Sequence, residues 1–286
     1  MATTAATENA CSKAVAVDPA TIEAFETLNK WKQRANNDDA ANKTSLTRWV
    51  YQHNRTQAAN KGFPSVLQVG LDGGLSEHEI AALYGWTTGD YRLVNPIARG
   101  HDVATFTEYP FLREGDMSQV QFVLDKSDVW PYVQLLQSAL SKIKEPPPRC
   151  VWRGIKRDLL KSSSSSVGST VGDTLTLPGF TSTTMDRDNA LEFCTKPDTA
   201  SSNSTPMKRT LLCILKPQSG TCISRLSARP QEMEVLFPPN CQFQIADPER
   251  VHTKQEDQAA VDEAVMKLQT TIPNATIGLV YVKEIT

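Results

Sequence analysis

Three consecutive prolines, Pro146–Pro148, constrain the fold of this chain more than any other feature. Proline lacks a backbone N–H, fixes its own φ and pushes the preceding residue toward extended backbone, so a helix cannot continue through such a run. Upstream of it, apolar residues recur at the spacing of helices; downstream, they come in short or alternating runs bounded by Gly, Pro and Ser. The sequence therefore predicts an α+β fold, with a mainly helical part at residues 20–145 and a β-rich part at residues 146–286.

The length of 286 residues allows one large domain or two smaller ones. Residues 1–19 are mostly small and polar and offer little to bury, so we expect a mobile tail there. We expect residues 20–286 to form one compact domain.

Several helices are expected before the prolines. Thr21–Leu28 and Ser45–His53 carry apolar residues on one face. Ser76, with a glutamate three residues later, is a capping box that opens a helix. The apolar spacing over Met117–Ile143 indicates two helical segments, broken at Pro131.

After the prolines, strands should dominate. They are expected at Cys150–Ile155, Thr174–Thr184, Arg209–Lys216, Thr221–Leu226, Glu232–Phe237, Cys241–Ile245 and Thr276–Ile285. Two helices interrupt them, at Arg187–Cys194 and Asp257–Leu268. The serine run Ser162–Ser166 is typical of a flexible connector.

Charge and composition exclude several classes of protein. The 30 Lys+Arg and 32 Asp+Glu residues give a net charge of −2, which argues against nucleic acid or an anionic membrane as a partner. No apolar run approaches the roughly 20 residues that span a bilayer. The six cysteines include no CxxC pair and the four histidines lack ligand spacing, so we expect no metal site.

The N-terminal residues lack the cationic and apolar regions of a secretory signal, so we expect a soluble protein that is cytoplasmic or exported by a non-classical route. The cysteines are then expected to be reduced thiols. One disulfide stays open as an alternative if the chain leaves its cell without a classical signal.

Arg153 follows an apolar strand segment and precedes Gly154. A guanidinium on a strand is a fixed fork of donors that suits a phosphate, and a glycine beside it lets a ligand approach the backbone. A surface arginine at a strand end is the alternative.

Ser182 lies in the hydroxyl-rich segment Gly179–Thr184. In a strand, Ser182 and Thr184 face one side and Thr181 and Thr183 the other, so one hydroxyl pair could line a cleft. The alternative is that the threonines are simply good strand formers.

Glu232 and Glu234 lie two residues apart, directly before the apolar run Val235–Phe237. In a strand or at its entry, both carboxylates would lie on the same side, and like charges that close raise each other's pKa. Such a pair at the entry to a core is a candidate site. Two solvated glutamates on an exposed strand are the alternative.

Taken in order, these motifs resemble the R-S-E signature of the mono-ADP-ribosyltransferases. The Glu-x-Glu form is typical of the arginine-specific members, whereas asparagine-modifying members carry Gln at the first position, so Glu232 carries the inference about the acceptor. The helix that Ser76 opens, with the later Tyr91 and Asn95, is similar to the helical segment that precedes the core in this family. Thr184 departs from the pattern, since serine is usual there.

The resemblance implies a split β-sandwich, two sheets packed face to face with a cleft between them, preceded by a helical subdomain. It implies NAD as co-substrate, an arginine-bearing protein target and the release of nicotinamide. Because no signal or anchor sequence is evident, a bacterial toxin or effector, or an intracellular enzyme, fits better than an ecto-enzyme. A monomer is expected.

The family roles carry over by position. Glu234 would stabilise the oxocarbenium-like transition state on the ribose, Ser182 would orient Glu234, and Arg153 would hold an NAD phosphate. The Gly154 backbone would meet the nicotinamide amide, and Glu232 would bind the acceptor arginine and take its proton.

Two further residues have open alternatives. Phe193 would either stack on nicotinamide or be an ordinary core residue of its helix. Arg229 would contact a phosphate or the acceptor, or have no role. The resemblance also leaves open an NAD glycohydrolase that uses water in the same site, and an interaction-only relative without catalysis.

Overall fold

The computed structural model describes residues 17–26, 66–108, 120–146, 148–156, 170–196, 208–248, 251, 253–272 and 274–285. Three expected features lie outside these ranges, namely the helix at Ser45–His53, the serine run and most of the N-terminal tail.

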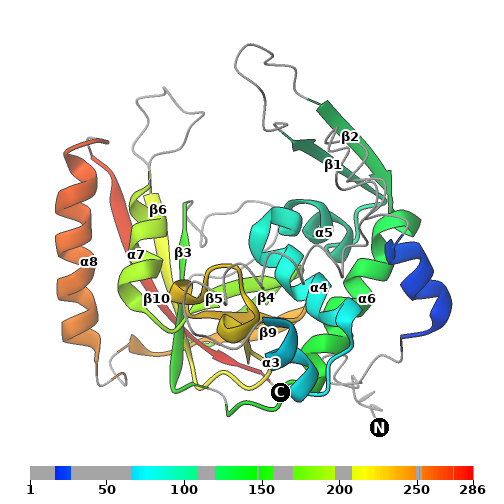
Figure 1. Ribbon diagram of the computed structural model, residues 1–286. Coiled ribbons are helices and arrows are strands. Elements are labelled where there is room, and N and C mark those ends of the chain that lie inside the picture. The colour runs from blue at the N-terminus through cyan, green and yellow to red at the C-terminus, as the bar shows by residue number, and fades with distance from the viewer. Residues whose placement is uncertain are drawn as a thin grey trace, which may run out of the picture.

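Helices stand on both sides of a central set of strands (Figure 1). The helices are α3 (Val66–Asp72), α4 (Glu77–Gly85), α5 (Tyr91–Ala98), α6 (Lys126–Lys142), α7 (Arg187–Thr195) and α8 (Lys254–Gln269). A π-helical turn, η2 (Trp86–Asp90), joins α4 to α5, and two 3-10 turns, η4 (Ser224–Leu226) and η5 (Pro230–Glu232), precede β8. Residues 19–26 form one more helix, beside α6 (Figure 1). Within the described ranges, no helix is long and apolar enough to cross a membrane.

The strands form one large sheet and one small one. They are β1 (Val103–Glu108), β2 (Val120–Asp125), β3 (Cys150–Ile155), β4 (Thr174–Leu177), β5 (Thr181–Thr184), β6 (Lys208–Leu215), β7 (Thr221–Cys222), β8 (Glu234–Phe237), β9 (Cys241–Ile245) and β10 (Thr276–Glu284). The eight-stranded sheet has the order β4-β9-β10-β6-β3-β5-β8-β7, and β1 pairs with β2 in a separate two-stranded sheet. This arrangement of helices and a large sheet confirms the expected α+β class.

The large sheet consists of two halves joined at a narrow seam. Trp152 of β3 opposite Thr184 of β5 is the register pair that connects them. The two halves nevertheless pack on each other, because Val235 and Phe237 of β8 share a core with Val151 of β3 and with residues of β6 and β10. The seam lies beside Arg153 and Ser182 and so positions the candidate site.

Strand β8 is buried on both faces. Val235 and Phe237 point into the core between the sheet halves, and Leu236 packs in a second core with Phe180 and Trp86. Because side chains alternate along a strand, Glu234 lies on the same face as Leu236, toward the helices before the sheet.

The helix that begins after Ser76 is confirmed. Ser76 Oγ accepts from the backbone N–H of Glu79 at 3.3 Å, and the Glu79 carboxylate accepts from the backbone N–H of Ser76 at 2.7 Å. This is the reciprocal capping box that the sequence predicted.

The two helical segments expected over Met117–Ile143 are wrong. Residues 120–125 form strand β2, and α6 then continues through Pro131. The cost of the lost backbone hydrogen bond is offset because α6 buries a broad apolar face that includes Tyr132 and Leu136. The partner strand β1 was not expected either.

Three expected strands differ from those observed. Thr174–Thr184 is two strands on opposite parts of the sheet, because Pro178-Gly179 turns the chain between β4 and β5. The strand expected over Thr221–Leu226 ends at Cys222 and gives way to η4. The strand expected from Glu232 begins at Glu234, because Met233 has a φ of 48° and interrupts extended backbone.

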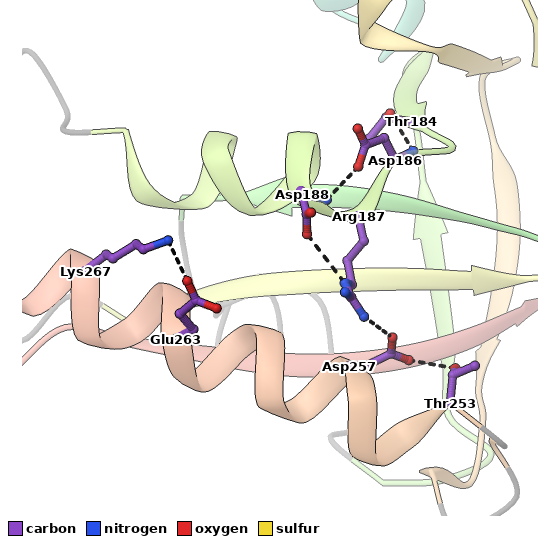
Figure 2. Close-up of polar contacts among 8 residues, drawn as sticks. All are labelled: Thr184, Asp186, Arg187, Asp188, Thr253, Asp257, Glu263 and Lys267. Carbon is purple, nitrogen blue, oxygen red and sulfur yellow. Dashed lines mark hydrogen bonds and ion pairs between the residues drawn. The ribbon is translucent and has the colours of Figure 1, made fainter.

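A buried carboxylate, Asp257, ties α7, α8 and β10 together, and Figure 2 shows its contacts with Arg187 and Thr253. Asp257 of α8 accepts hydrogen bonds from Arg187 Nη1 of α7 at 3.0 Å, Thr253 Oγ1 at 2.8 Å and Tyr281 Oη of β10 at 2.8 Å. Because α7 also packs on β3, this network holds α7 against the sheet next to the seam.

Asp257→Ala should lower the free energy of unfolding by about 2–3 kcal/mol, because it removes the acceptor of Arg187 Nη1 and of Tyr281 Oη. Chemical denaturation measures this change. Glu263→Ala is the matched control, since Glu263 pairs with Lys267 on the exposed face of the same helix and should have little effect (Figure 2). Equal losses in both variants would contradict the importance of the Asp257 network.

Candidate functional site

Glu234, the first residue of β8, is the centre of the site. Its residue is only 5% exposed, and its Oε1 accepts hydrogen bonds from Ser182 Oγ at 2.6 Å and from Trp86 Nε1 at 3.1 Å. Among the described residues, no donor contacts the other oxygen, Oε2. Both donors that the described residues supply therefore act on the same carboxylate oxygen.

Strand pairing brings Ser182 to Glu234. In the antiparallel pair of β5 and β8, Ser182 lies opposite Leu236 and Thr184 lies opposite Glu234. Ser182 and Glu234 are therefore diagonal neighbours on one face of the sheet, which is close enough for a direct side-chain contact. Thr183, on the other face, donates instead to the Val235 carbonyl.

The hydroxyl of Thr184 holds the segment before Glu234. Thr184 Oγ1 donates to the backbone carbonyl of Glu232 at 2.7 Å and accepts from the backbone N–H of Asp186 at 3.0 Å. Threonine at this position thus keeps a hydroxyl that makes hydrogen bonds.

Trp86 is the residue that the sequence analysis missed. It begins the π-helical turn η2, its residue is 2% exposed, and its ring lies 5.4 Å from Phe180. The turn is anchored because Thr87 Oγ1 donates to the Tyr84 carbonyl and accepts from the backbone N–H of Ala228 at 3.0 Å. Trp86 lies at the end of the helical segment that resembles the family, but neither spacing nor periodicity indicates that its indole reaches a residue 148 positions away.

Arg153 lies beside Ser182, across the seam of the sheet. Its Nη1 donates to the backbone carbonyl of Ser182. Arg153 shares a strand face with Val151 and is half-buried. The structure thus brings Arg153, Ser182 and Glu234 together.

Glu232 does not share a strand with Glu234, which corrects the strand alternation expected for the pair. It ends the turn η5, and the left-handed backbone of Met233 separates the two glutamates. The Glu232 side chain is 31% exposed, and its Oε1 lies 3.2 Å from Arg229 Nη1. The two carboxylates are close enough for the charge of Glu232 to affect Glu234, but only Glu234 is buried.

Burial raises the pKa of Glu234 above its ordinary value. The hydrogen bonds from Ser182 and Trp86 and the positive charge of Arg153 lower this pKa, whereas the negative charge of Glu232 raises it further. Because the net direction is upward, the protein holds this carboxylate in an environment that opposes its charge.

Gly154 and Phe193 lie next to each other behind the seam. A Cβ on Gly154 would lie 2.1 Å from the Ala190 carbonyl oxygen and 3.0 Å from Phe193 Cβ, so the packing of α7 on β3 requires glycine here. Phe193 is 43% exposed, and the Lys196 ammonium lies 4.7 Å from its ring centroid. Phe193 is therefore not an ordinary core residue, which was one of its two alternatives.

A cavity of about 240 Å³ lies elsewhere, lined by Val171, Gln244 and Lys283 among others, and contains none of these residues. Across the described ranges, no group of three or more His, Cys, Asp or Glu side chains is arranged to hold a metal ion.

The ADP-ribosyltransferase exoenzyme family matches residues 29–268 of the chain. No match was found among curated proteins. Solved structures with a similar arrangement include the type III effector XopAI from Xanthomonas axonopodis pv. citri, with 17% identity, coverage of 95% of this chain and 90% of that chain, and a TM-score of 0.47.

Two more are the Vis toxin, an ADP-ribosyltransferase from Vibrio splendidus, and the ADP-ribosyltransferase HopU1 of Pseudomonas syringae pv. Tomato DC3000. Vis has 20% identity, coverage of 96% of this chain and 88% of that chain, and a TM-score of 0.45. HopU1 has 16% identity, coverage of 94% and 98%, and a TM-score of 0.47. The family match covers most of the chain, which therefore belongs to the ADP-ribosyltransferase exoenzyme family, whose enzymes take ADP-ribose from NAD.

Proposed function

We propose that this protein transfers ADP-ribose from NAD to an arginine side chain of a target protein, acting as a monomeric toxin or effector. The observation that carries the proposal is the buried Glu234 carboxylate, held through one oxygen by Ser182 and Trp86 and lying near Arg153. A separate, more exposed carboxylate, Glu232, stands beside it.

Cleavage of the bond between nicotinamide and the ribose C1′ develops positive charge on the ribose, as in glycoside hydrolysis. Glu234 would provide negative charge where this charge develops, and its Oε2 would accept a hydrogen bond from a ribose hydroxyl. Ser182 and Trp86 hold Oε1 in place, so that little reorganisation is needed during the reaction.

Arg153, Gly154 and Phe193 are proposed to hold NAD. The Arg153 guanidinium offers donors for a phosphate oxygen beside the seam. Phe193 is exposed and its Cβ lies beside Gly154, and its ring is proposed as the stacking surface for nicotinamide.

Glu232 is proposed to bind and deprotonate the acceptor. A guanidinium is a poor nucleophile until it loses a proton, and its high pKa requires that loss to accompany the attack. Glu232 already pairs with a guanidinium, that of Arg229, at 3.2 Å, and an acceptor arginine would make a contact of the same kind.

Two alternatives to this function are open, one with a different acceptor and one without catalysis. An NAD glycohydrolase would use water in the same site, and an interaction-only relative would keep the fold alone. Against the latter stands the joint presence of Arg153, Ser182, Glu232 and Glu234.

The test measures nicotinamide release and ADP-ribosyl transfer with agmatine, a small guanidine, as acceptor. Glu234→Gln should reduce both by at least about 100-fold, because the change removes the negative charge beside the ribose. Glu232→Gln should reduce transfer to agmatine by ~10²–10⁴-fold and NAD hydrolysis much less, because only transfer needs the acceptor's base. Unchanged rates in Glu234→Gln would overturn the proposal, and equal losses in Glu232→Gln would exclude Glu232 as the base.

Trp86→Phe should lower kcat by about tenfold or more, with KM for NAD nearly unchanged, because one hydrogen bond to the carboxylate is lost while the ring stays. In the wild type, the hydrogen bond from Trp86 lowers the pKa of Glu234. Its loss should raise this pKa, so the acidic limb of the pH profile of kcat should move to higher pH. Trp130→Phe is the control, because Trp130 is exposed on α6 beside Lys126. An unchanged kcat and pH profile in Trp86→Phe would contradict the positioning role.

Glu234 should also make stability depend on pH. Its pKa is raised from the ordinary 4.5, so the folded state disfavours the charged form, and stability is lost as the pH rises through the raised pKa. Glu234→Gln avoids this loss, so its unfolding midpoint should exceed that of the wild type by more at pH 8 than at pH 4. If the difference in unfolding midpoint between Glu234→Gln and the wild type were the same at both pH values, burial of the charged Glu234 carboxylate would have no cost in stability.

A further inference from the structure

The hydroxyl of Thr87 joins two parts of the site that lie far apart in the sequence. Thr87 follows Trp86 in the turn η2, and its Oγ1 donates to the Tyr84 carbonyl at 2.8 Å. The same oxygen accepts from the backbone N–H of Ala228 at 3.0 Å, across 141 residues of sequence. One half-buried hydroxyl thus connects the turn that carries Trp86 to the chain that leads to Glu232.

Ala228 belongs to residues 227–232, which we call the acceptor segment because they end at Glu232. Ser227, at the start of the segment, is 4% exposed, and its Oγ accepts from the backbone N–H of Arg229 at 2.9 Å. The Arg229 carbonyl in turn accepts from the backbone N–H of Glu232 at 3.0 Å. Consecutive hydrogen bonds therefore link the start of the segment to the proposed acceptor carboxylate.

The other end of the acceptor segment is fastened to the sheet and to α7. Thr184 Oγ1 donates to the Glu232 carbonyl at 2.7 Å, and Asn189 Nδ2 of α7 donates to the Gln231 carbonyl at 3.2 Å. A segment that is anchored at both ends loses little further freedom when it binds a guanidinium. A segment released at one end must be ordered again at each binding event, which costs conformational entropy.

Trp86 depends less on Thr87 than the acceptor segment does. The backbone N–H of Trp86 donates to two carbonyls of α4, so the helix itself holds this residue. Its ring is buried and lies 5.4 Å from that of Phe180. The hydrogen bond between Ala228 and Thr87 therefore serves the acceptor segment more than it serves the Trp86 indole.

We propose that Thr87 is a positioning residue that favours arginine over water as the acceptor of ADP-ribose, because it holds the acceptor segment so that Glu232 stays beside the reacting ribose. This inference rests on the proposed function. It adds to that function a residue that decides which acceptor receives the ADP-ribose, although Thr87 itself contacts neither the acceptor nor Glu232.

The two reactions share their first half and differ in the acceptor. In both, the bond between the ribose C1′ and nicotinamide breaks, and its electron pair leaves with nicotinamide. The pair for the new bond comes either from a guanidino nitrogen, whose proton passes to Glu232, or from a water oxygen, whose proton passes to solvent. Because arginine must be bound and must lose its proton to a fixed base, transfer depends on the position of Glu232 more than hydrolysis does.

The experiment measures, in one reaction of the full chain with NAD and agmatine, the amounts of ADP-ribosyl-agmatine and of free ADP-ribose. Thr87→Val exchanges the hydroxyl for a methyl group and removes the acceptor of the Ala228 N–H. The ratio of transfer to hydrolysis should therefore fall by about tenfold. Thr87→Ser keeps the hydroxyl and should restore the ratio. If Thr87→Val does not fold, Thr87→Ala tests the same loss.

Thr88→Val is the matched control. Thr88 lies in the same turn, and its Oγ1 donates to the Gly85 carbonyl at 2.9 Å, so the hydrogen bond that the structure describes for it stays within the turn. Its loss should leave the ratio of transfer to hydrolysis at the wild-type value. A fall as large as that of Thr87→Val would show that any change in the turn has this effect, and would overturn the inference.

Amide hydrogen exchange tests the connection apart from catalysis. The backbone N–H groups of Ala228, Glu232 and Met233 are all hydrogen-bonded in the structure. In Thr87→Val all three should exchange about five- to tenfold faster, because the whole segment is released. In Thr88→Val they should exchange at the wild-type rate. Faster exchange confined to Ala228 would overturn the connection from Thr87 to Glu232.

The products separate failure of this inference from failure of the proposed function. If the wild type modifies agmatine but Thr87→Val keeps the wild-type ratio, or if Thr87→Ser does not restore it, the role of Thr87 is wrong and the proposed function stands. If the wild type forms free ADP-ribose and no ADP-ribosyl-agmatine, or releases no nicotinamide, the proposed function is wrong and this inference falls with it.

Discussion

The burial of the Glu234 carboxylate is the constraint on which the site depends. A charged group inside a protein is costly unless hydrogen bonds compensate it. Here the compensation comes from two distant segments, the Ser182 hydroxyl and the Trp86 indole, and both act on the same oxygen. The second oxygen has no hydrogen-bond donor among the described residues, so the compensation that the structure describes acts on one oxygen only.

The two glutamates acquire different environments although only one residue separates them. The left-handed backbone at Met233 ends η5 and redirects the chain, so Glu234 enters the sheet while Glu232 stays at its margin. Two carboxylates with different solvation can take different tasks, as acid–base sites in proteins generally require. The same turn brings the Arg229 guanidinium within 3.2 Å of the Glu232 carboxylate.

Much of the fold followed from local patterns. The capping box at Ser76, the strand Cys150–Ile155 and the helix that starts at Arg187 are set by neighbouring residues and were found where expected. The expectations failed where tertiary contacts override local preference. Pro131 is accommodated inside α6 because the apolar face of α6 is buried. Strand β2 forms because it pairs with β1, which no local sequence pattern predicted.

The sequence alone was sufficient to indicate the family. Residue types and their order are properties of the sequence itself, and the family motif consists of Arg153, Ser182, Glu232 and Glu234 in that order. Only the tertiary structure decided which carboxylate is buried and what holds it. That answer depends on a diagonal pair across β5 and β8 and on an indole 148 residues away. Contacts of this kind arise when two layers close on a strand that is buried on both faces, and no spacing within one segment encodes them.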